Sequence, residues 1–256
     1  MAHLNQQVLF SLSFVVCLFI AMVLVLEAGR RLGRRSRHEA DNTGTGFGAV
    51  EGAVFGLLGL LIAFSFSGAS NRFNARRALI AEEANAAEAA YMYVDLLPEG
   101  IQTNVRDLIR EYLDLRIAIY RRLPNFEYDS PEMKRSEELR KRIWSLATRA
   151  GPEPNEAVLA ALMRMFEDGN LRIDAHKTHA PGVLYGVLVI FSLACALLAG
   201  YGMSSSKARS WTHIFGFALI LAISVYLILD LEHPRAGLIN IESYDQVLVN
   251  ARNAMK

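Results

Sequence analysis

The sequence predicts an all-α membrane protein with four transmembrane helices and a helical-bundle insert between the second and third. Hydrophobic residues make up 52% of the 256 residues, and the mean hydropathy is positive at +0.21. Most charged residues lie between residues 67 and 180, with long apolar stretches on both sides. The net charge of +1 offers no strongly basic face for nucleic acid. We expect four parts: residues 1–67 with two spans, 68–180 as the extramembrane insert, 181–230 as a transmembrane hairpin, and 231–256 as the tail.

Four apolar stretches have the length of a membrane-spanning helix, which needs roughly 20 residues to cross a hydrocarbon core of about 30 Å. They are residues 8–26, 48–67, 182–203 and 211–229. No Lys or Arg precedes the first, and no small-residue cleavage site follows it, so we expect a retained anchor. Glu51 lies in the first turn of the second, within reach of the headgroup region. Tyr201 and Trp211 flank the turn between the last two, which we expect to form a tight hairpin.

The insert shows helical patterns separated by prolines. No breaker occurs between the second span and Pro98, so residues 71–97 are expected to continue the membrane helix. After Pro98, apolar residues recur at helical spacing: Ile101, Val105, Leu108, Tyr112, Leu115 and Ile119. Ser130, followed by Pro131, and Asn155, followed by Glu156, have the features of helix N-caps. The insert is therefore expected to be a small helical bundle.

The charges that flank the spans disagree about orientation. Five arginines lie between the first two spans: Arg30, Arg31, Arg34, Arg35 and Arg37. Together with Lys207 and Arg209 in the hairpin turn, they favour a cytoplasmic location for those loops. Arg72, Arg76 and Arg77 follow the second span and favour a cytoplasmic location for the insert instead. The charge pattern leaves the orientation open.

No catalytic constellation stands out. His176 and His179 share a helix face, but two histidines without a third positioned ligand more often form a solvated helix end than a metal site. Glu82, Glu83 and Glu88 have no histidine or nucleophile beside them, which favours a solvated or interface-lining face over acid/base chemistry. A membrane enzyme would need polar catalytic residues inside the spans, where we find only a few serines. We therefore expect no enzyme, no metal site and no cofactor.

The second span carries a row of small residues and a row of large apolar residues. Gly48, Gly52 and Gly56 recur every fourth residue, a pattern typical of close helix packing within or between subunits. Leu57, Leu60 and Phe64 share another part of the helix face. If several copies surround an axis, these three would form a hydrophobic constriction; otherwise they are core residues. Many alanines between residues 75 and 90 favour a helix with several neighbours, and therefore an oligomer.

At these residues the sequence resembles the bestrophin-like domain family of bacterial membrane proteins, which is distantly similar to the bestrophin ion channels. The resemblance lies in LLGLLIAFSFSGASNRFNARRAL at residues 57–79, EEANA at 82–86 and DLEHPRAGLI at 230–239. In bacterial bestrophins an apolar second span ends in phenylalanine, followed by an arginine–aromatic pair and a further arginine before a leucine. Phe64, Arg72 with Phe73, Arg77 and Leu79 occupy these places, whereas Gly56 and Asn74 depart from the bestrophin pattern.

The resemblance implies a homopentamer in a bacterial inner membrane, with the second span lining a central pore and a neck at Leu60 and Phe64. It also implies that the insert is cytoplasmic. We expect acidic partners in the bundle for Arg72 and Arg77, and a vestibule lined by the following acids: Glu82, Glu83 and Glu88. The permeant ion stays unknown, because arginines near these acids would oppose their potential. The alternative is a non-conducting scaffold or sensor that binds a partner through its insert.

Overall fold

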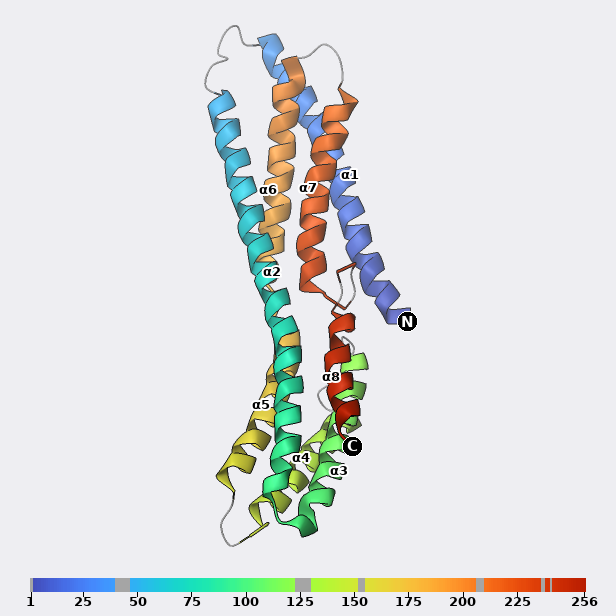
Figure 1. Cartoon of the computed structure of the whole chain (residues 1–256). Helices are drawn as coiled ribbons and strands as arrows, with labels where there is room; N and C mark the ends of the chain where they lie inside the picture. The colour runs from blue at the N-terminus through green and yellow to red at the C-terminus, as the bar shows by residue number, and fades with distance from the viewer. Residues whose placement is uncertain are drawn as a thin grey trace. The chain divides into compact units, whose positions relative to one another are not determined.

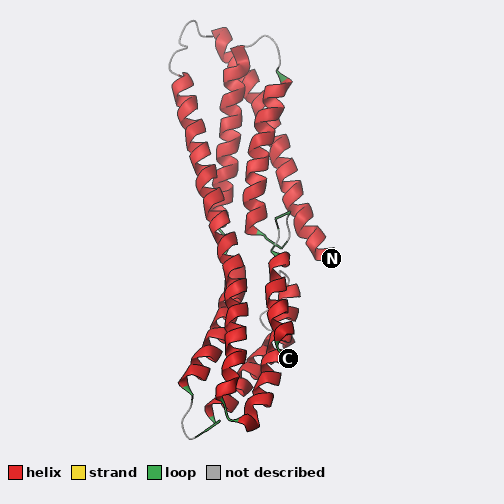
Figure 2. Ribbon diagram, in the orientation of Figure 1, coloured by secondary structure: helices red, strands yellow, loops and turns green. Residues whose placement is uncertain are grey.

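The computed structural model describes residues 2–39, 47–122, 130–151, 155–205, 210–235, 238–239 and 241–256. Figure 2 shows helices and no strands in these residues. Four of the helices are long and apolar enough to cross a membrane. The prediction of an all-α protein with four membrane-length helices is confirmed. Lys207, Arg209 and residues 236–237 of the closing motif lie outside the described residues.

The chain forms two compact units, Met1–Arg72 with His179–Ile239 and Phe73–Thr178 with Asn240–Lys256. The first unit contains α1 (Ala2–Glu39), the start of α2 (Phe47–Tyr93), α6 (Gly182–Gly202), η2 (Met203–Ser205) and α7 (Trp211–Glu232). The second contains the rest of α2, η1 (Val94–Leu96), α3 (Glu99–Arg122), α4 (Pro131–Thr148), α5 (Glu156–Lys177) and α8 (Glu242–Ala254) (Figure 1). The expected continuation of the second span as one helix beyond residue 71 is confirmed.

In the first unit, α1 packs against both α6 and α7, and α6 packs far more extensively on α1 than on α7. α1 and α6 pack closely because glycines lie where the two helices meet. A Cβ placed on Gly29 would lie 2.1 Å from the Leu197 carbonyl oxygen, and one on Gly200 would lie 2.0 Å from the Leu26 carbonyl oxygen. Only glycine permits this backbone approach.

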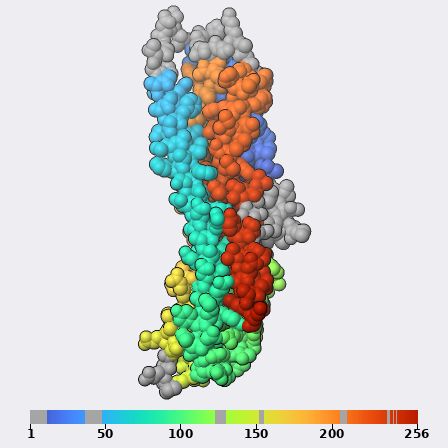
Figure 3. All heavy atoms as spheres, in the orientation of Figure 1, coloured from blue at the N-terminus to red at the C-terminus, as the bar shows by residue number. Residues whose placement is uncertain are grey.

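The described α2 takes little part in the packing of the first unit. Leu58 is buried there, and the Phe55 ring meets the Phe217 ring of α7 edge to face at 6.1 Å. Yet only 11% of the most apolar window of α2 is buried, against 39% for α7. Figure 3 shows the membrane part of α2, in blue and cyan, at the surface.

Two parts of the chain differ from the sequence expectation. The arginine-rich segment after the first span, expected to be a loop, continues α1 as far as Glu39. The tail contains a helix, α8, which we did not predict from its weakly apolar sequence. Leu248 and Ala251 of α8 join the core of the second unit, so tertiary packing stabilises this short helix.

In the second unit, α3 packs against α4 and α8, and α4 packs against α5. The predicted stripe of α3 supplies much of the core, with Val105, Leu108, Tyr112 and Ile119 all buried. Both predicted N-caps are confirmed. Ser130 Oγ accepts a hydrogen bond from the Met133 N–H at 3.3 Å, and Asn155 Oδ1 accepts one from the Val158 N–H at 3.2 Å.

Candidate functional site: the exposed face of α2

The large apolar residues of the second span lie on a face of α2 that no described residue of the chain covers. The exposed fractions of Leu57, Leu60 and Phe64 are 56%, 51% and 68%. Steps of three and four residues place them on one side of the helix. The hydroxyl of Ser65 turns inward and donates to the Leu61 carbonyl oxygen at 2.7 Å. This face of α2 is thus apolar.

The small residues of the same span are not used for packing within one described chain. A Cβ placed on Gly48, Gly52, Gly56 or Gly59 would meet no described atom within 4 Å, leaving out the helix's own nearby backbone. Among the described residues, no other helix of the chain packs on this row. Close glycine packing occurs instead between α1 and α6, which the row in α2 did not predict.

At the end of the second span and beyond it, the exposed residues of α2 include polar side chains, in contrast to the apolar ones within the span. These polar residues are Ser67, Asn71, Asn74, Glu82, Asn85 and Glu88. By helical spacing Asn85 lies about 60° around the helix axis from Glu82, and Glu88 lies about 60° further on. This part of the face presents hydroxyl, amide and carboxylate groups.

The arginines that follow the second span each contact a different partner, and Arg77 remains exposed beside its partner. Arg72 Nε donates to Glu232 Oε1 at 2.7 Å, and the Glu232 side chain is completely buried. The Ala180 N–H also donates to Glu232, at 3.4 Å. The expected acidic partner of Arg72 therefore exists, but it lies at the end of α7 and not in the helical insert.

Arg76 and Arg77 have partners of other kinds. Arg76 Nε donates to the Ala175 carbonyl oxygen at 3.1 Å, and its Nη2 donates to the Thr178 carbonyl oxygen at 2.6 Å. These carbonyls belong to the C-terminal end of α5, where a cation is favourable. The Arg77 guanidinium lies over the Tyr244 ring of α8, 4.3 Å from its centroid. The acidic partner expected for Arg77 is replaced by a cation–π contact.

Glu83 does not share the exposure of Glu82 and Glu88. It is 1% exposed and forms ion pairs with two buried arginines, Arg116 at 3.2 Å and Arg172 at 2.7 Å. Adjacent helix positions differ by about 100° around the axis, so neighbours point in different directions. Glu83 thus stabilises the interior of the second unit instead of lining a solvent-facing vestibule.

Tyrosines complete this buried cluster. The Tyr120 hydroxyl donates to Glu83 Oε1 at 2.7 Å, and the Tyr120 ring lies 3.6 Å from the Arg172 guanidinium. Burial raises the pKa of the Tyr120 hydroxyl well above its usual value, and the Glu83 charge acts in the same direction against the opposing charge of Arg116. The tyrosine is therefore a neutral hydrogen-bond donor at physiological pH.

His176 and His179 do not come together with a third ligand in the described structure. The His179 ring stacks on the His233 ring with centroids 5.2 Å apart, and its Nδ1 lies 3.8 Å from Glu232 Oε2. No group of three or more His, Cys, Asp or Glu residues in the described ranges has an arrangement suited to a metal ion.

Sequence reasoning missed the residues that hold the arginines. Glu232 belongs to the closing motif of the resemblance, but its role as the partner of Arg72 was not recognised. Tyr244, and Asp245, which pairs with Arg172 at 2.5 Å, lie in the unpredicted helix α8. The sequence signal for such partners is a basic residue among apolar helix positions. A charge that becomes buried there needs a partner elsewhere in the chain.

A family model described as the Bestrophin-like domain matches residues 8–244, which is nearly the whole chain. No curated protein and no solved structure matches the chain.

Proposed function

Since the chain belongs to the bestrophin-like family of membrane proteins, we propose that it forms a homopentameric ion channel in a bacterial inner membrane. In this assembly α2 of each copy lines a central pore. The observation that carries the proposal is the bare face of α2, which is apolar within the membrane and polar beyond it. The unused space beside Gly48, Gly52 and Gly56 supports close approach of a second copy.

The neck of the proposed pore consists of Leu57, Leu60 and Phe64. Five copies of each would form apolar rings, and a narrow apolar ring excludes water and so blocks ions until it widens. Phe64 is the most exposed of the three and belongs to the position at which the resemblance places the neck. We therefore assign it the largest share of the barrier.

We also propose that the channel prefers cations. The arginines that follow the second span would oppose this preference if they faced the pore. Arg72, Arg76 and Arg77 instead point toward Glu232, the end of α5 and Tyr244. Glu82 and Glu88 are exposed carboxylates, whereas the exposed Arg77 lies over the Tyr244 ring. Repeated around an axis, these carboxylates would raise the local concentration of cations.

The first test is the number of subunits, from single-particle class averages of detergent-purified protein along the membrane normal. Five-fold classes would support α2 as the pore-lining helix. A monomer or a two-fold dimer would contradict the channel and favour the scaffold alternative. Ion flux into proteoliposomes is the second test. An assembled pentamer without flux under any membrane potential would contradict the channel and leave the pentamer standing.

A further inference from the structure

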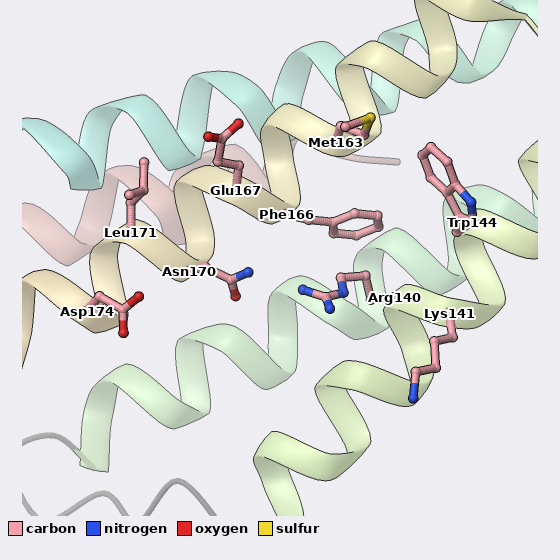
Figure 4. Close-up of a pocket in the computed structure, with 9 residues that line it drawn as sticks. All are labelled: Arg140, Lys141, Trp144, Met163, Phe166, Glu167, Asn170, Leu171 and Asp174. Carbon is pink, nitrogen blue, oxygen red and sulfur yellow. The ribbon is translucent and has the colours of Figure 1, made fainter.

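The groove between α4 and α5 has a floor of apolar side chains. Its volume is about 550 Å³, within the range of roughly 300–1,000 Å³ typical of small-molecule sites. This floor consists of Trp144 from α4 and of Met163 and Phe166 from α5 (Figure 4). Met163 of α5 is 59% exposed. The neighbouring helix α4 is rich in charged residues, so this apolar side chain lies on an otherwise polar surface. Exposed apolar surface of this kind is a common feature of ligand sites.

Three polar groups beside this floor donate no hydrogen bond to any residue that the structure describes. The Arg140 guanidinium lies 6.0 Å from the centroid of the Phe166 ring and has no ion pair or hydrogen bond to any described residue. The same holds, among the described residues, for the indole N–H of Trp144 and the side-chain amide of Asn170. Figure 4 shows the polar ends of Arg140 and Asn170 directed toward each other beside the Phe166 ring.

The acidic residues of the groove do not neutralise Arg140. Figure 4 shows the Glu167 carboxylate on the side of α5 turned away from Arg140. Asp174 lies at the far end of the groove and forms an ion pair with Lys177 at 3.4 Å. Lys141 also belongs to the lining, and Figure 4 shows its ammonium directed away from the Phe166 ring. Of the four charged residues that line the groove, Arg140 is the one whose charge lies beside the aromatic floor.

We propose that this groove binds a small organic anion with a flat apolar body and a carboxylate. A guanidinium binds a carboxylate through two parallel hydrogen bonds. The amide of Asn170 supplies a further donor, and the rings of Trp144 and Phe166 contact the apolar body. A purely apolar ligand would leave these donors unsatisfied, and an inorganic anion would leave the floor exposed. The inference is independent of ion conduction, because it concerns binding alone.

The two tryptophans of the chain make this groove accessible to a direct measurement. Trp211→Phe leaves Trp144 as the only tryptophan, so its emission reports on the groove. Full-length purified protein is titrated with phenylacetate, and with phenylacetamide as the uncharged analogue of the same shape. We expect a saturable change of Trp144 emission with phenylacetate, and at least about tenfold weaker binding of phenylacetamide, which corresponds to about 1.4 kcal/mol.

Two charge variants locate the anion. Arg140→Gln should weaken phenylacetate binding at least about tenfold and leave phenylacetamide binding unchanged, because it removes the charged donor of the carboxylate contact. Arg142→Gln removes an exposed charge of the same helix that does not line the groove, and should change neither ligand. If Trp211→Phe does not assemble, equilibrium dialysis of radiolabelled phenylacetate against the wild-type protein, with protein-free micelles as blank, measures the same affinities.

The proposal is overturned by any of three results. Absence of saturable phenylacetate binding in both assays would remove the site. Equal affinity for the acid and the amide would show that the groove recognises no anion. Equal losses in Arg140→Gln and Arg142→Gln would show attraction by overall surface charge without a defined contact.

Discussion

Arg72 and Glu232 form a hydrogen-bonded ion pair across 160 residues of sequence, with 2.7 Å between Arg72 Nε and Glu232 Oε1. The pair joins α2 to the last turn of α7. Because the Glu232 carboxylate is completely buried and the Arg72 side chain is 28% exposed, the carboxylate depends on this partner far more than the arginine does.

Glu232→Gln should destabilise the protein by about 1–3 kcal/mol, because Arg72 then loses its charged acceptor while the amide keeps only part of the hydrogen bonding. The melting temperature of the purified protein should fall by several degrees. Glu138→Gln is the matched control, since Glu138 and its partner Arg135, 3.3 Å apart, are 63% and 45% exposed, and such surface pairs contribute little. Similar melting temperatures for the two variants would contradict the role of Glu232.

Gly200→Ala should destabilise the contact between α1 and α6. The added methyl would lie 2.0 Å from the Leu26 carbonyl oxygen, so the helices must separate, at a cost of about 1–3 kcal/mol. Gly186→Ala in the same helix meets no described atom within 4 Å and should leave the melting temperature unchanged or raise it slightly. A stable Gly200→Ala protein would show that the helices move apart freely.

Phe64→Ala should raise ion flux into proteoliposomes by roughly tenfold, because the smaller side chain leaves a wider and more easily hydrated neck. Ile220→Ala is the control: Ile220 is as exposed as Phe64 but lies on α7, where the proposed pore assigns it no contact with ions. If both variants assemble and conduct at the wild-type rate, Phe64 is not part of the barrier.

Glu82→Gln should reduce cation preference, because each subunit loses one carboxylate beside the proposed pore. The reversal potential in a salt gradient should move toward zero, with the larger effect at low ionic strength. Glu137→Gln removes an exposed acid of α4 and should leave the reversal potential unchanged. A shift of equal size in both variants would point to overall charge instead of a ring at Glu82.

Tyr120 predicts a loss of stability in alkaline solution. Its pKa is raised in the folded protein relative to the unfolded chain, so its contribution is complete below about pH 10 and decreases as the pH rises toward the folded pKa. Tyr120→Phe should flatten this decrease in melting temperature, and at pH 7 should cost about 1 kcal/mol for the lost hydrogen bond to Glu83. Tyr93→Phe removes an exposed hydroxyl and should keep the wild-type pH profile.

Features with local causes could be predicted from the sequence. The N-caps at Ser130 and Asn155 depend on groups three residues away, and the stripe of α3 depends on spacing along one helix. The partners of Arg72, Arg76 and Arg77 depend on residues distant in the chain, which spacing does not reveal. The pattern of Gly48, Gly52 and Gly56 indicates a surface suited to close packing, but whether a neighbour occupies it depends on the tertiary structure.

The exposed apolar face of α2 affects the order in which a copy of the chain folds and associates with other copies. A newly inserted copy can expose Leu57, Leu60 and Phe64 to lipid chains without penalty, because acyl chains are as apolar as these residues. In the membrane, apolar burial therefore gives almost no drive for copies to associate. In the proposed pentamer, close packing beside Gly52 and Gly56, and contacts of the insert in water, would supply the free energy of association. Folding of the single copy should thus precede assembly, and the concentration of copies in the bilayer should determine how many assemble.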